Sequence, residues 1–276
     1  MKQTIKLWKN TSTLDGLSPL VEDTVSPAEA ELAVLGSRPL DWDTFPALRA
    51  IFKCGVGTDN IPFALCRERG IRIGMPSEAT REIIFAETAN FAVQLILRML
   101  YQEVGNWDEW TKRARPFLGH QTVLLIGQGN IGQRVRRKLE PLCQVQSYDV
   151  LTHSPGQLRP LMEAAAVVSL HVPLDETTRH FLDAEKLSWL RDGAIVVNTA
   201  RGPVIEEAAL YQECAAGRLR AALDVFWQEP YDGPLAQLPP EVVYRTPHVA
   251  STCVDFLHGL ARDLEALVGE LATSGS

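Results

Sequence analysis

Three polar side chains able to bind an anion and to move a proton follow separate apolar runs in the second half of the chain. They are Arg201, Glu229 and His248. A guanidinium can bind a planar carboxylate through paired hydrogen bonds and polarise a neighbouring carbonyl. An imidazole can give or take a hydroxyl proton, and a carboxylate beside it favours its charged form. We therefore predict these three residues as catalytic groups for interconverting a 2-hydroxy acid and a 2-oxo acid, with Arg201 and His248 also binding the substrate.

Each of these residues also has an ordinary structural interpretation. An arginine beside a glycine is often a surface residue, a glutamate before a proline is often a loop charge, and a histidine after a proline is often a turn residue. What favours the catalytic interpretation is their position. If the runs are strands of one parallel sheet, all three residues follow its carboxyl edge, where open α/β sheets bind ligands.

A glycine-rich turn lies between an apolar run and a helical pattern near the middle of the chain. Residues 123–126 lead into Gly127, Gly129 and Gly132, after which apolar residues recur at helical spacing. In a dinucleotide-binding fold such glycines allow a tight turn, close approach of a pyrophosphate and close helix packing. The N-terminus of the following helix offers unpaired N–H groups to the phosphates. A glycine turn that only serves packing is the alternative, and the same pattern also holds FAD or S-adenosylmethionine.

The nature of the dinucleotide is indicated by Asp149, which ends the next apolar run. Its carboxylate can accept hydrogen bonds from the ribose hydroxyls and would repel a 2′-phosphate. We therefore predict NAD as the cofactor, in preference to NADP. His171, in a turn after another apolar run, is the other histidine that we expect in the pocket.

Composition bounds the class of protein. The 276 residues are 46% hydrophobic and 22% charged, as in globular proteins of one or two domains. The 27 basic and 34 acidic residues give a net charge of −7, and the single short basic cluster is 134–138, so we expect no nucleic-acid partner. The five cysteines lack metal spacing, so we expect no metal site and a reducing, cytoplasmic compartment.

Neither a secretory signal nor a membrane span is expected. The N-terminus has no apolar segment after its lysines. The most apolar segment, 85–100, is interrupted by Glu87, Asn90, Gln94 and Arg98, and we interpret it as too polar and too short to cross a bilayer.

The elements that must position these residues alternate between strand and helix. We predict strands near 4–8, 32–35, 49–53 and 71–73, with a helix capped by Asn60 and ended by Gly70. A long helix follows from about 80 to 101, joining two domains or packing against a second subunit. Further strands are predicted near 122–126, 144–148, 166–170, 194–198 and 220–223, and a short one at 242–244. This alternation predicts an α/β fold with parallel sheets.

A second glycine turn follows the strand predicted at 49–53. It contains Gly55, Val56 and Gly57, and its exposed backbone N–H groups can hold a carboxylate. A plain turn is the alternative interpretation.

Taken together, these motifs resemble the D-isomer-specific 2-hydroxyacid dehydrogenase family. The matching segments are CGVGTDNI at 54–61, LGHQTVLLIGQGNIG at 118–132, SLHVPLDETTRH at 169–180, GAIVVNTARGPVI at 193–205, ALDVFWQEP at 222–230 and TPHVA at 246–250. The resemblance implies a Rossmann-type doubly wound parallel sheet domain, residues 79–252, inserted in a smaller flavodoxin-like α/β substrate domain, residues 1–78 and 253–276. It also implies NAD-dependent oxidoreductase activity and a homodimer formed through the NAD domain.

The resemblance also assigns site residues. Arg201, Glu229 and His248 fall on the family's catalytic residues, and Val56 and Gly57 fall on its substrate-carboxylate loop. Lys53 stands where phosphoglycerate dehydrogenases tend to carry a basic residue, which implies contact with a distal anionic group, whereas a solvent-facing lysine is the default interpretation. The predicted cofactor contacts are Gly127, Gly129, Asn130, Ile131, Gly132, Asp149, His171, Pro173, Thr199, Ala200, Asp224 and His248.

Two other functions are compatible with the same motifs. One is an NAD-sensing interaction protein, similar to the family's transcriptional co-repressor branch, which keeps the same three catalytic residues. The other is a formate or phosphonate dehydrogenase of the same family.

Overall fold

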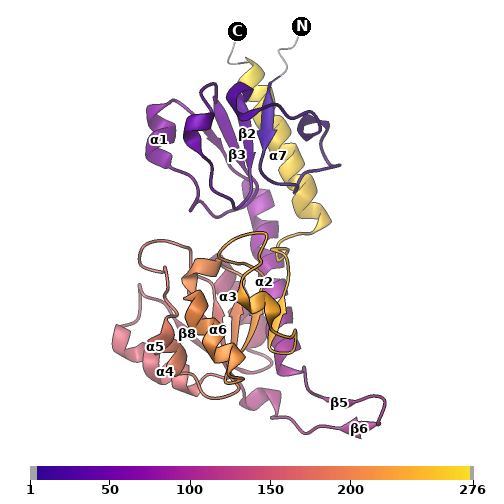
Figure 1. The fold of residues 1–276 in the computed structure, drawn as a ribbon, viewed down its shortest axis with the longest axis vertical. Coiled ribbons are helices and arrows are strands. Elements are labelled where there is room, and N and C mark those ends of the chain that lie inside the picture. The colour runs from indigo at the N-terminus through magenta and orange to yellow at the C-terminus, as the bar shows by residue number, and fades with distance from the viewer. Residues whose placement is uncertain (1–4, 274–276) are drawn as a thin grey trace. The chain divides into compact units, whose positions relative to one another are not determined.

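The computed structural model describes residues 5–273, which fall into two compact units. The first comprises Met1–Ile84 and Ser251–Ser276, and the second comprises Phe85–Ala250. The long helix α2 (Glu78–Leu100) contains the boundary at Ile84. Each unit is built on its own parallel sheet, as the strand and helix alternation predicts (Figure 1).

The second unit contains a six-stranded parallel sheet in the order β12-β11-β10-β9-β7-β8. Its strands are β7 (Thr122–Ile126), β8 (Gln144–Tyr148), β9 (Val167–Leu170), β10 (Ile195–Asn198), β11 (Arg220–Leu223) and β12 (Val243–Arg245). The helices are α3 (Asn130–Leu139), α4 (Leu158–Ala164), α5 (Ala184–Ser188) and α6 (Glu207–Ala215). Because the chain runs outward from β7 in both directions, the sheet is doubly wound, and the predicted fold class is confirmed.

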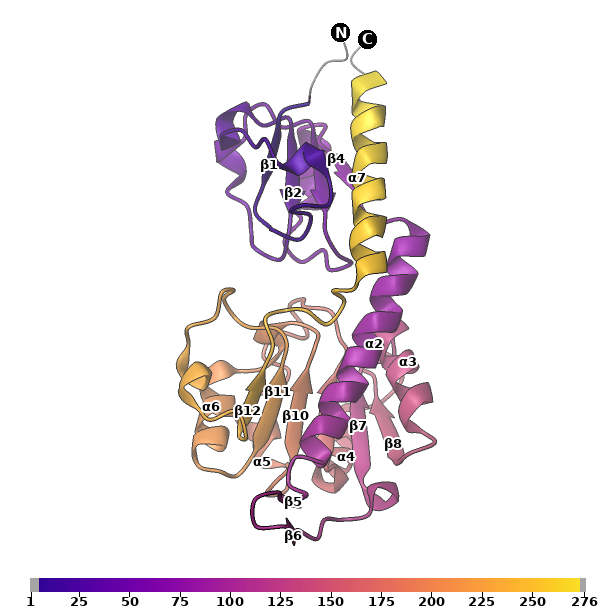
Figure 2. The same ribbon diagram turned by 90° about the vertical axis from the view of Figure 1, so that its right-hand side faces the viewer.

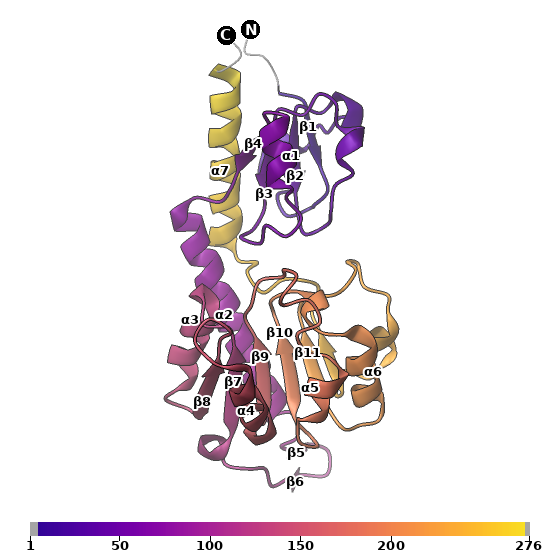
Figure 3. The same ribbon diagram turned by 90° about the vertical axis from the view of Figure 1, so that its left-hand side faces the viewer.

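Helices cover both faces of this sheet, and strand alternation decides which residues meet them (Figures 2 and 3). Val123 and Leu125 of β7 pack with residues of α2 and α3 in one core cluster. Leu124 and Ile126 pack with residues of α4, α5 and α6 in the other cluster. Successive side chains of a strand point to opposite faces, so a fully apolar run such as 123–126 requires helices on both sides.

The first unit contains a four-stranded parallel sheet in the order β1-β2-β3-β4. Its elements are β1 (Leu7–Lys9), β2 (Leu32–Leu35), β3 (Ala50–Lys53), β4 (Arg72–Gly74), α1 (Phe63–Glu68) and α7 (Val254–Thr273). A parallel bridge joins Leu7, the first residue of β1, to Thr24, which belongs to none of these strands. Counting that bridge as a strand reduced to one residue gives the flavodoxin-like order 2-1-3-4-5. The predicted strand at 4–8 is therefore observed at 7–9, and residue 4 lies outside the described residues.

One predicted cap is wrong. The helix α1 begins at Phe63 after Pro62, without a side-chain cap. The amide of Asn60 instead donates to the backbone carbonyls of Gly36 at 3.0 Å and Arg38 at 2.9 Å. Asn60 therefore ties two loops together, whereas Gly70 follows the helix with a φ of +65° as predicted.

The helix α2 is long and apolar enough to span a membrane by length and composition, with 39% of its most apolar window buried. The interpretation of this segment as too short and too polar is therefore wrong, because the helix begins at Glu78 and has 23 residues. Part of its apolar character is explained by packing. Ala89, Ala92, Leu95 and Ile96 are fully buried in the core of the second unit.

A two-stranded antiparallel hairpin follows α2 and has no counterpart in the predictions. It is formed by β5 (Gly105–Asn106) and β6 (Thr111–Lys112). Trp107 and Trp110 between these strands are 79% and 75% exposed, and their rings pack edge to face with centroids 5.0 Å apart. The hairpin therefore presents large aromatic surfaces outward.

Candidate active site

The three predicted catalytic residues all lie in loops that leave the carboxyl edge of the second sheet. The strand register places Asn198, Leu223 and Arg245, the last residues of β10, β11 and β12, side by side. Arg201, Glu229 and His248 follow these three strand ends. The parallel sheet thus brings into neighbouring loops three side chains that are far apart in the sequence.

Glu229 and His248 are in direct contact. The imidazole Nδ1 lies 2.8 Å from Oε2 and 3.0 Å from Oε1 of Glu229. The His248 side chain is 35% exposed, and the Glu229 side chain is 22% exposed. With Nδ1 donating to the carboxylate, Nε2 is the nitrogen left to exchange a proton with a bound molecule.

The backbone of His248 is in a sparsely populated conformation. Its φ is +53°, in the left-handed region that residues other than glycine seldom adopt. Such a conformation persists only where the surroundings impose it, and it is found preferentially at functional sites.

Asp224 imposes the conformation of the His248 turn. Its Oδ1 accepts from the Thr246 hydroxyl at 2.6 Å and from the backbone N–H of Val249 at 2.9 Å. Its Oδ2 accepts from the backbone N–H of Ala250 at 2.9 Å. Burial raises the pKa of Asp224, and the three hydrogen bonds act in the opposite direction. Asp224 therefore holds the chain on both sides of His248, and the cofactor contact implied for it stays a prediction.

The loop of Arg201 is held against the loop of Glu229. A Cβ atom on Gly202 would lie 2.1 Å from the carbonyl carbon of Phe226, so only glycine allows this approach. The backbone N–H of Phe226 in turn donates to Oε1 of Glu229 at 3.2 Å. The indole of Trp227 donates to the carbonyl of Ile205 at 2.8 Å, which fixes the same two loops.

Asn198 positions the turn that carries Arg201 and was not among the predicted site residues. It is fully buried at the end of β10. Its Nδ2 donates to the Arg201 carbonyl at 2.8 Å, and its Oδ1 accepts from the N–H of Ala200 at 2.9 Å. A polar residue at the end of an otherwise apolar strand was the available signal for this role. Arg201 itself donates from Nη1 to the Ala200 carbonyl at 2.8 Å.

The glycine turn has the shape that a dinucleotide pyrophosphate requires. Gly127 has a φ of +96°, and a Cβ there would lie 2.6 Å from the carbonyl oxygen of His171. A Cβ on Gly132 would lie 2.1 Å from the carbonyl oxygen of Gly127. Among the described residues other than its chain neighbours, no atom lies within 4 Å of the corresponding position on Gly129, which precedes Asn130 and Ile131 at the start of α3. The turn is thus closed at two glycines and open at the one that faces the helix N-terminus, which fits NAD.

Asp149 closes the other side of this turn. Its Oδ2 accepts from the N–H of Gln128 at 2.8 Å, and its Oδ1 accepts from the N–H of Leu151 at 2.9 Å. Each carboxylate oxygen has a second lone pair available, so the group can still accept from ribose hydroxyls.

Two buried polar atoms at the same edge lack a partner within the described residues. They are Nδ1 of His171 and Oγ1 of Thr199. The His171 Nε2 lies 3.0 Å from the Ser169 hydroxyl, and burial lowers the pKa of His171 to about 4. Unpaired buried groups are costly, and a bound cofactor would offer them hydrogen bonds. Pro173 and Ala200 lie in the loops that contain these two residues.

In the first unit, the predicted carboxylate loop follows β3, with Gly55 at a φ of +151°. Val56 and Gly57 lie in this loop, and both are partly exposed. Lys53 precedes it and is only 2% exposed, with its ammonium group donating to the carbonyl of Gly36. This contact of Lys53 is internal to the unit, and its substrate contact stays a prediction. Among residues 5–273, no three acidic, histidine or cysteine side chains group as metal ligands.

Comparisons with known proteins agree with this geometry. Residues 90–250 match the model of the D-isomer specific 2-hydroxyacid dehydrogenase NAD binding domain. The chain is 34% identical over 222 residues to hydroxypyruvate reductase of Thermotoga maritima, covering 75% of this chain and 72% of that protein. It is 32% identical over 272 residues to glyoxylate reductase of Korarchaeum cryptofilum, covering 90% and 80%.

A solved structure shows the same fold. It is D-lactate dehydrogenase from Aquifex aeolicus, complexed with NAD and lactic acid, with a TM-score of 0.76 at 24% identity, covering 90% of this chain and 84% of that one. The family match spans the glycine turn and all three catalytic-type residues. The chain therefore belongs to the D-isomer-specific 2-hydroxyacid dehydrogenases, NAD-dependent oxidoreductases that interconvert 2-hydroxy acids and 2-oxo acids.

Proposed function

We propose that this protein reduces a small 2-oxo acid to the D-2-hydroxy acid, with Arg201, Glu229 and His248 as its catalytic residues. The observation that carries the proposal is the contact of His248 Nδ1 with both oxygens of Glu229, at 3.0 and 2.8 Å, beside the loop of Arg201. The hydroxypyruvate and glyoxylate reductases among the relatives support this substrate class.

His248 supplies the proton in this proposal. Glu229 accepts from Nδ1 and stabilises the charged imidazole, so the proton on Nε2 is available to the oxygen on C2 of the substrate. After that proton leaves, the neutral ring keeps Nδ1–H toward Glu229, and the tautomer is fixed. In the oxidation direction Nε2 takes the proton back.

Arg201 binds and polarises the substrate. Its guanidinium can form paired hydrogen bonds with the carboxylate and place positive charge beside the C2 carbonyl, which favours charge development on that oxygen. When bound, NADH supplies the hydride that reaches C2. The open glycine turn, Asp149, Thr199 and His171 are the groups that we assign to holding it.

We assign the first unit to the substrate and the second to NAD. In the first unit the backbone N–H groups of Val56 and Gly57 are the proposed carboxylate contacts, by resemblance to the family. The internal hydrogen bond of Lys53 to Gly36 favours a role in holding this loop. We therefore expect small 2-oxo acids without a distal phosphate to be the better substrates.

A homodimer through the second unit is also proposed. The hairpin residues Val104, Trp107 and Trp110 and the nearby Phe117 are exposed by 49%, 79%, 75% and 71%. Large exposed apolar side chains of this kind favour an interaction site. A second copy is the occupant that we propose, because α2, directly before the hairpin, has large apolar side chains that are only half-buried, among them Phe85, Phe91 and Leu97.

Cytoplasmic localisation is proposed from the cysteines, without a nucleic-acid or membrane partner. All five are free thiols in the structure. Thiols in this state suit a reducing compartment.

The function is tested with a substrate panel. Purified protein and NADH are mixed with glyoxylate, hydroxypyruvate, pyruvate and 3-phosphohydroxypyruvate, and NADH absorbance is followed; formate and phosphite are tested with NAD. The proposal predicts turnover of at least one unphosphorylated 2-oxo acid. Binding of NADH without turnover of any member would favour the NAD-sensing alternative.

A further inference from the structure

The outer edge of β8 is open. β8 pairs with β7 alone, and none of the residues 5–273 forms a strand on its other side. In the common Rossmann order 3-2-1-4-5-6 a third strand covers the corresponding edge. Here the chain passes from β8 through α4 to β9 on the far side of β7, so that position is not filled by the described residues.

The hydrogen bonds of β8 show which backbone groups face outward. Gln144 N donates to Gln121 O at 3.0 Å, and Tyr148 O accepts from Gly127 N at 2.8 Å, so these two residues face β7. Backbone groups alternate in direction along a strand, so the N–H and C=O groups of Val145 and Ser147 point to the open edge. The next outward N–H, that of Asp149, donates to the His153 ring at 3.2 Å.

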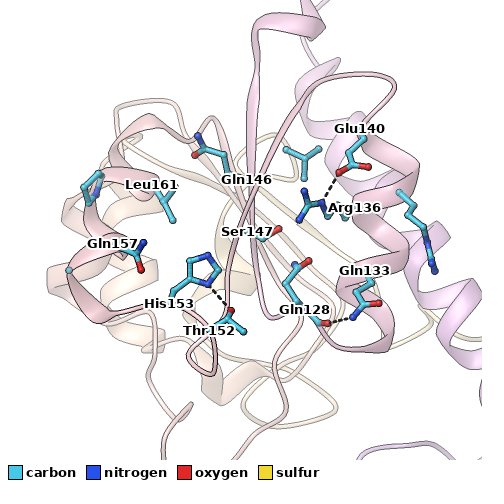
Figure 4. A pocket seen from close by; sticks show the side chains of 14 residues that line it. Gln128, Gln133, Arg136, Glu140, Gln146, Ser147, Thr152, His153, Gln157 and Leu161 are labelled. Carbon is cyan, nitrogen blue, oxygen red and sulfur yellow. Dashed lines mark hydrogen bonds and ion pairs between the residues drawn. The ribbon is translucent and has the colours of Figure 1, made fainter.

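A groove of about 980 Å³ runs along this edge (Figure 4). Its floor is Val145, Gln146 and Ser147, and residues of α3 and α4 form its walls. Gln146 Oε1 and Ser147 Oγ are buried and have no partner among the described residues. Figure 4 shows these two side chains on opposite sides of β8. The groove therefore offers unpaired hydrogen-bonding groups from both the backbone and the side chains.

Apolar residues are exposed at both ends of β8. Leu142 precedes the strand and is 42% exposed, and Val150 and Leu151 follow it at 53% and 89%. None of the three lines the groove, but a segment that extends past both ends of β8 would lie beside them.

We propose that the groove binds an extended polypeptide segment, which adds to β8 as a further strand and carries an acidic residue toward Arg137. Strand addition supplies partners for the outward groups of Val145 and Ser147. On the wall formed by α3, Arg136 is paired with Glu140 at 2.6 Å. Arg137 lines the groove without a carboxylate partner among the described residues. Its charge favours an acidic partner.

A second copy of β8 is a less suitable occupant. Paired strands lie about 4.8 Å apart. In each copy β8 lies at the floor of a groove between α3 and α4, so pairing of two copies would also have to bring their α3 and α4 helices against each other. A single extended segment can enter the groove without such contacts.

The proposal is tested with a displayed library of random twelve-residue peptides, selected on the wild-type protein with NADH. Ser147→Pro removes the outward N–H together with the Oγ of Ser147, and proline is tolerated on the open side of an edge strand. Arg137→Glu reverses the wall charge, and Lys138→Glu, which does not line the groove, is its matched control. Thermal unfolding shows that each variant is folded.

We expect enrichment of peptides with alternating apolar residues, at least one acidic residue and no central proline. The enriched peptides should slow hydrogen exchange of the Val145 and Ser147 amides. Their affinity should fall about tenfold with Arg137→Glu and little with Lys138→Glu. The proposal would be overturned if no peptide were enriched, or if the peptides bound Arg137→Glu and Lys138→Glu equally. It would also be overturned if the two amides were protected without peptide in a way that depends on protein concentration, because that result would identify a second copy as the occupant. If Ser147→Pro does not fold, the comparison of Arg137→Glu with Lys138→Glu tests the proposal alone.

Discussion

The imidazole Nδ1 of His248 lies 2.8 Å from Oε2 of Glu229, and the two residues come from loops that follow different strands. The contact fixes which ring nitrogen faces the carboxylate and leaves Nε2 for the substrate. Glu229 thus orients the imidazole ring, whereas Asp224 holds the backbone of the His248 turn.

Replacing Glu229 by Gln should lower kcat on the order of ten- to a hundredfold, a part of the 10²–10⁴ associated with general acid catalysis. The amide cannot stabilise a charged imidazole as a carboxylate does. Steady-state NADH oxidation measures the effect, and KM for the 2-oxo acid should change less than kcat. Glu229→Asp should recover part of the loss, and exposed Glu241→Gln serves as control. Unchanged kcat in Glu229→Gln would remove Glu229 from the mechanism.

Replacing Asp224 by Asn should reduce both stability and activity. One of the three hydrogen bonds to the carboxylate loses its acceptor, and a buried unsatisfied donor costs about 1–3 kcal/mol. Urea unfolding measures the loss, and kcat should fall because the His248 turn is no longer fixed. Asp192→Asn, whose side chain is 89% exposed, is the matched control. Equal effects of the two substitutions would show that Asp224 does not position the turn.

His171 should make stability depend on pH in mildly acid solution. Its pKa is lowered by burial to about 4, from a value near 6.5 in an unfolded chain. The unfolded chain therefore takes up a proton as the pH falls through about 6.5, while the folded protein does not. The contribution of His171 to the free energy of unfolding is therefore fully present above about pH 6.5 and is lost as the pH falls toward 4. The loss between pH 7 and pH 5 is about 2 kcal/mol. Urea unfolding at both pH values should show a smaller loss for His171→Asn, and equal losses would contradict a neutral, buried ring.

Replacing Trp107 and Trp110 together by Ser should weaken the proposed dimer. The two residues are 79% and 75% exposed, so a monomer loses little folding stability with them. Light scattering coupled to size-exclusion chromatography measures the mass of the particle. Phe63→Ser, at a 49% exposed position in the first unit, is the control and should leave the mass unchanged. A wild-type monomer, or a double variant that remains dimeric, would count against this interface.

Most strands of the second unit and the chemistry at their ends could be predicted from the sequence. Fully apolar runs such as 123–126 and 195–197 require burial on both faces. Three glycines at 127, 129 and 132, between such a run and a helix, are the pattern that a dinucleotide turn requires. These signals are readable because each depends only on residues close together in the chain.

The residues that position the site could not be predicted in the same way. Asp224 binds the turn after β12 from the end of β11, so its role depends on which strands are neighbours, whereas Asn198 acts locally on Ala200 and Arg201. The free edge of β8 depends likewise on sheet order, although the polar sequence of β8 differs from the apolar runs of the central strands. The expected cap at Asn60 failed for a related reason, since its Nδ2 donates to two distant carbonyls, and its Oδ1, the atom that a cap uses, has no partner among the described residues.

The central claim is tested most directly by tracing the hydride and the proton donor together. Wild-type protein and His248→Asn are incubated with NADH that carries deuterium at both C4 positions of the nicotinamide and with the best 2-oxo acid of the panel, and the product is analysed by mass spectrometry and chiral chromatography. The mechanism predicts a D-2-hydroxy acid with one deuterium on C2, formed at least about a hundredfold more slowly by His248→Asn. His258→Asn, at an exposed position, should match the wild type. Product without deuterium, or equal rates for wild type and His248→Asn, would contradict it.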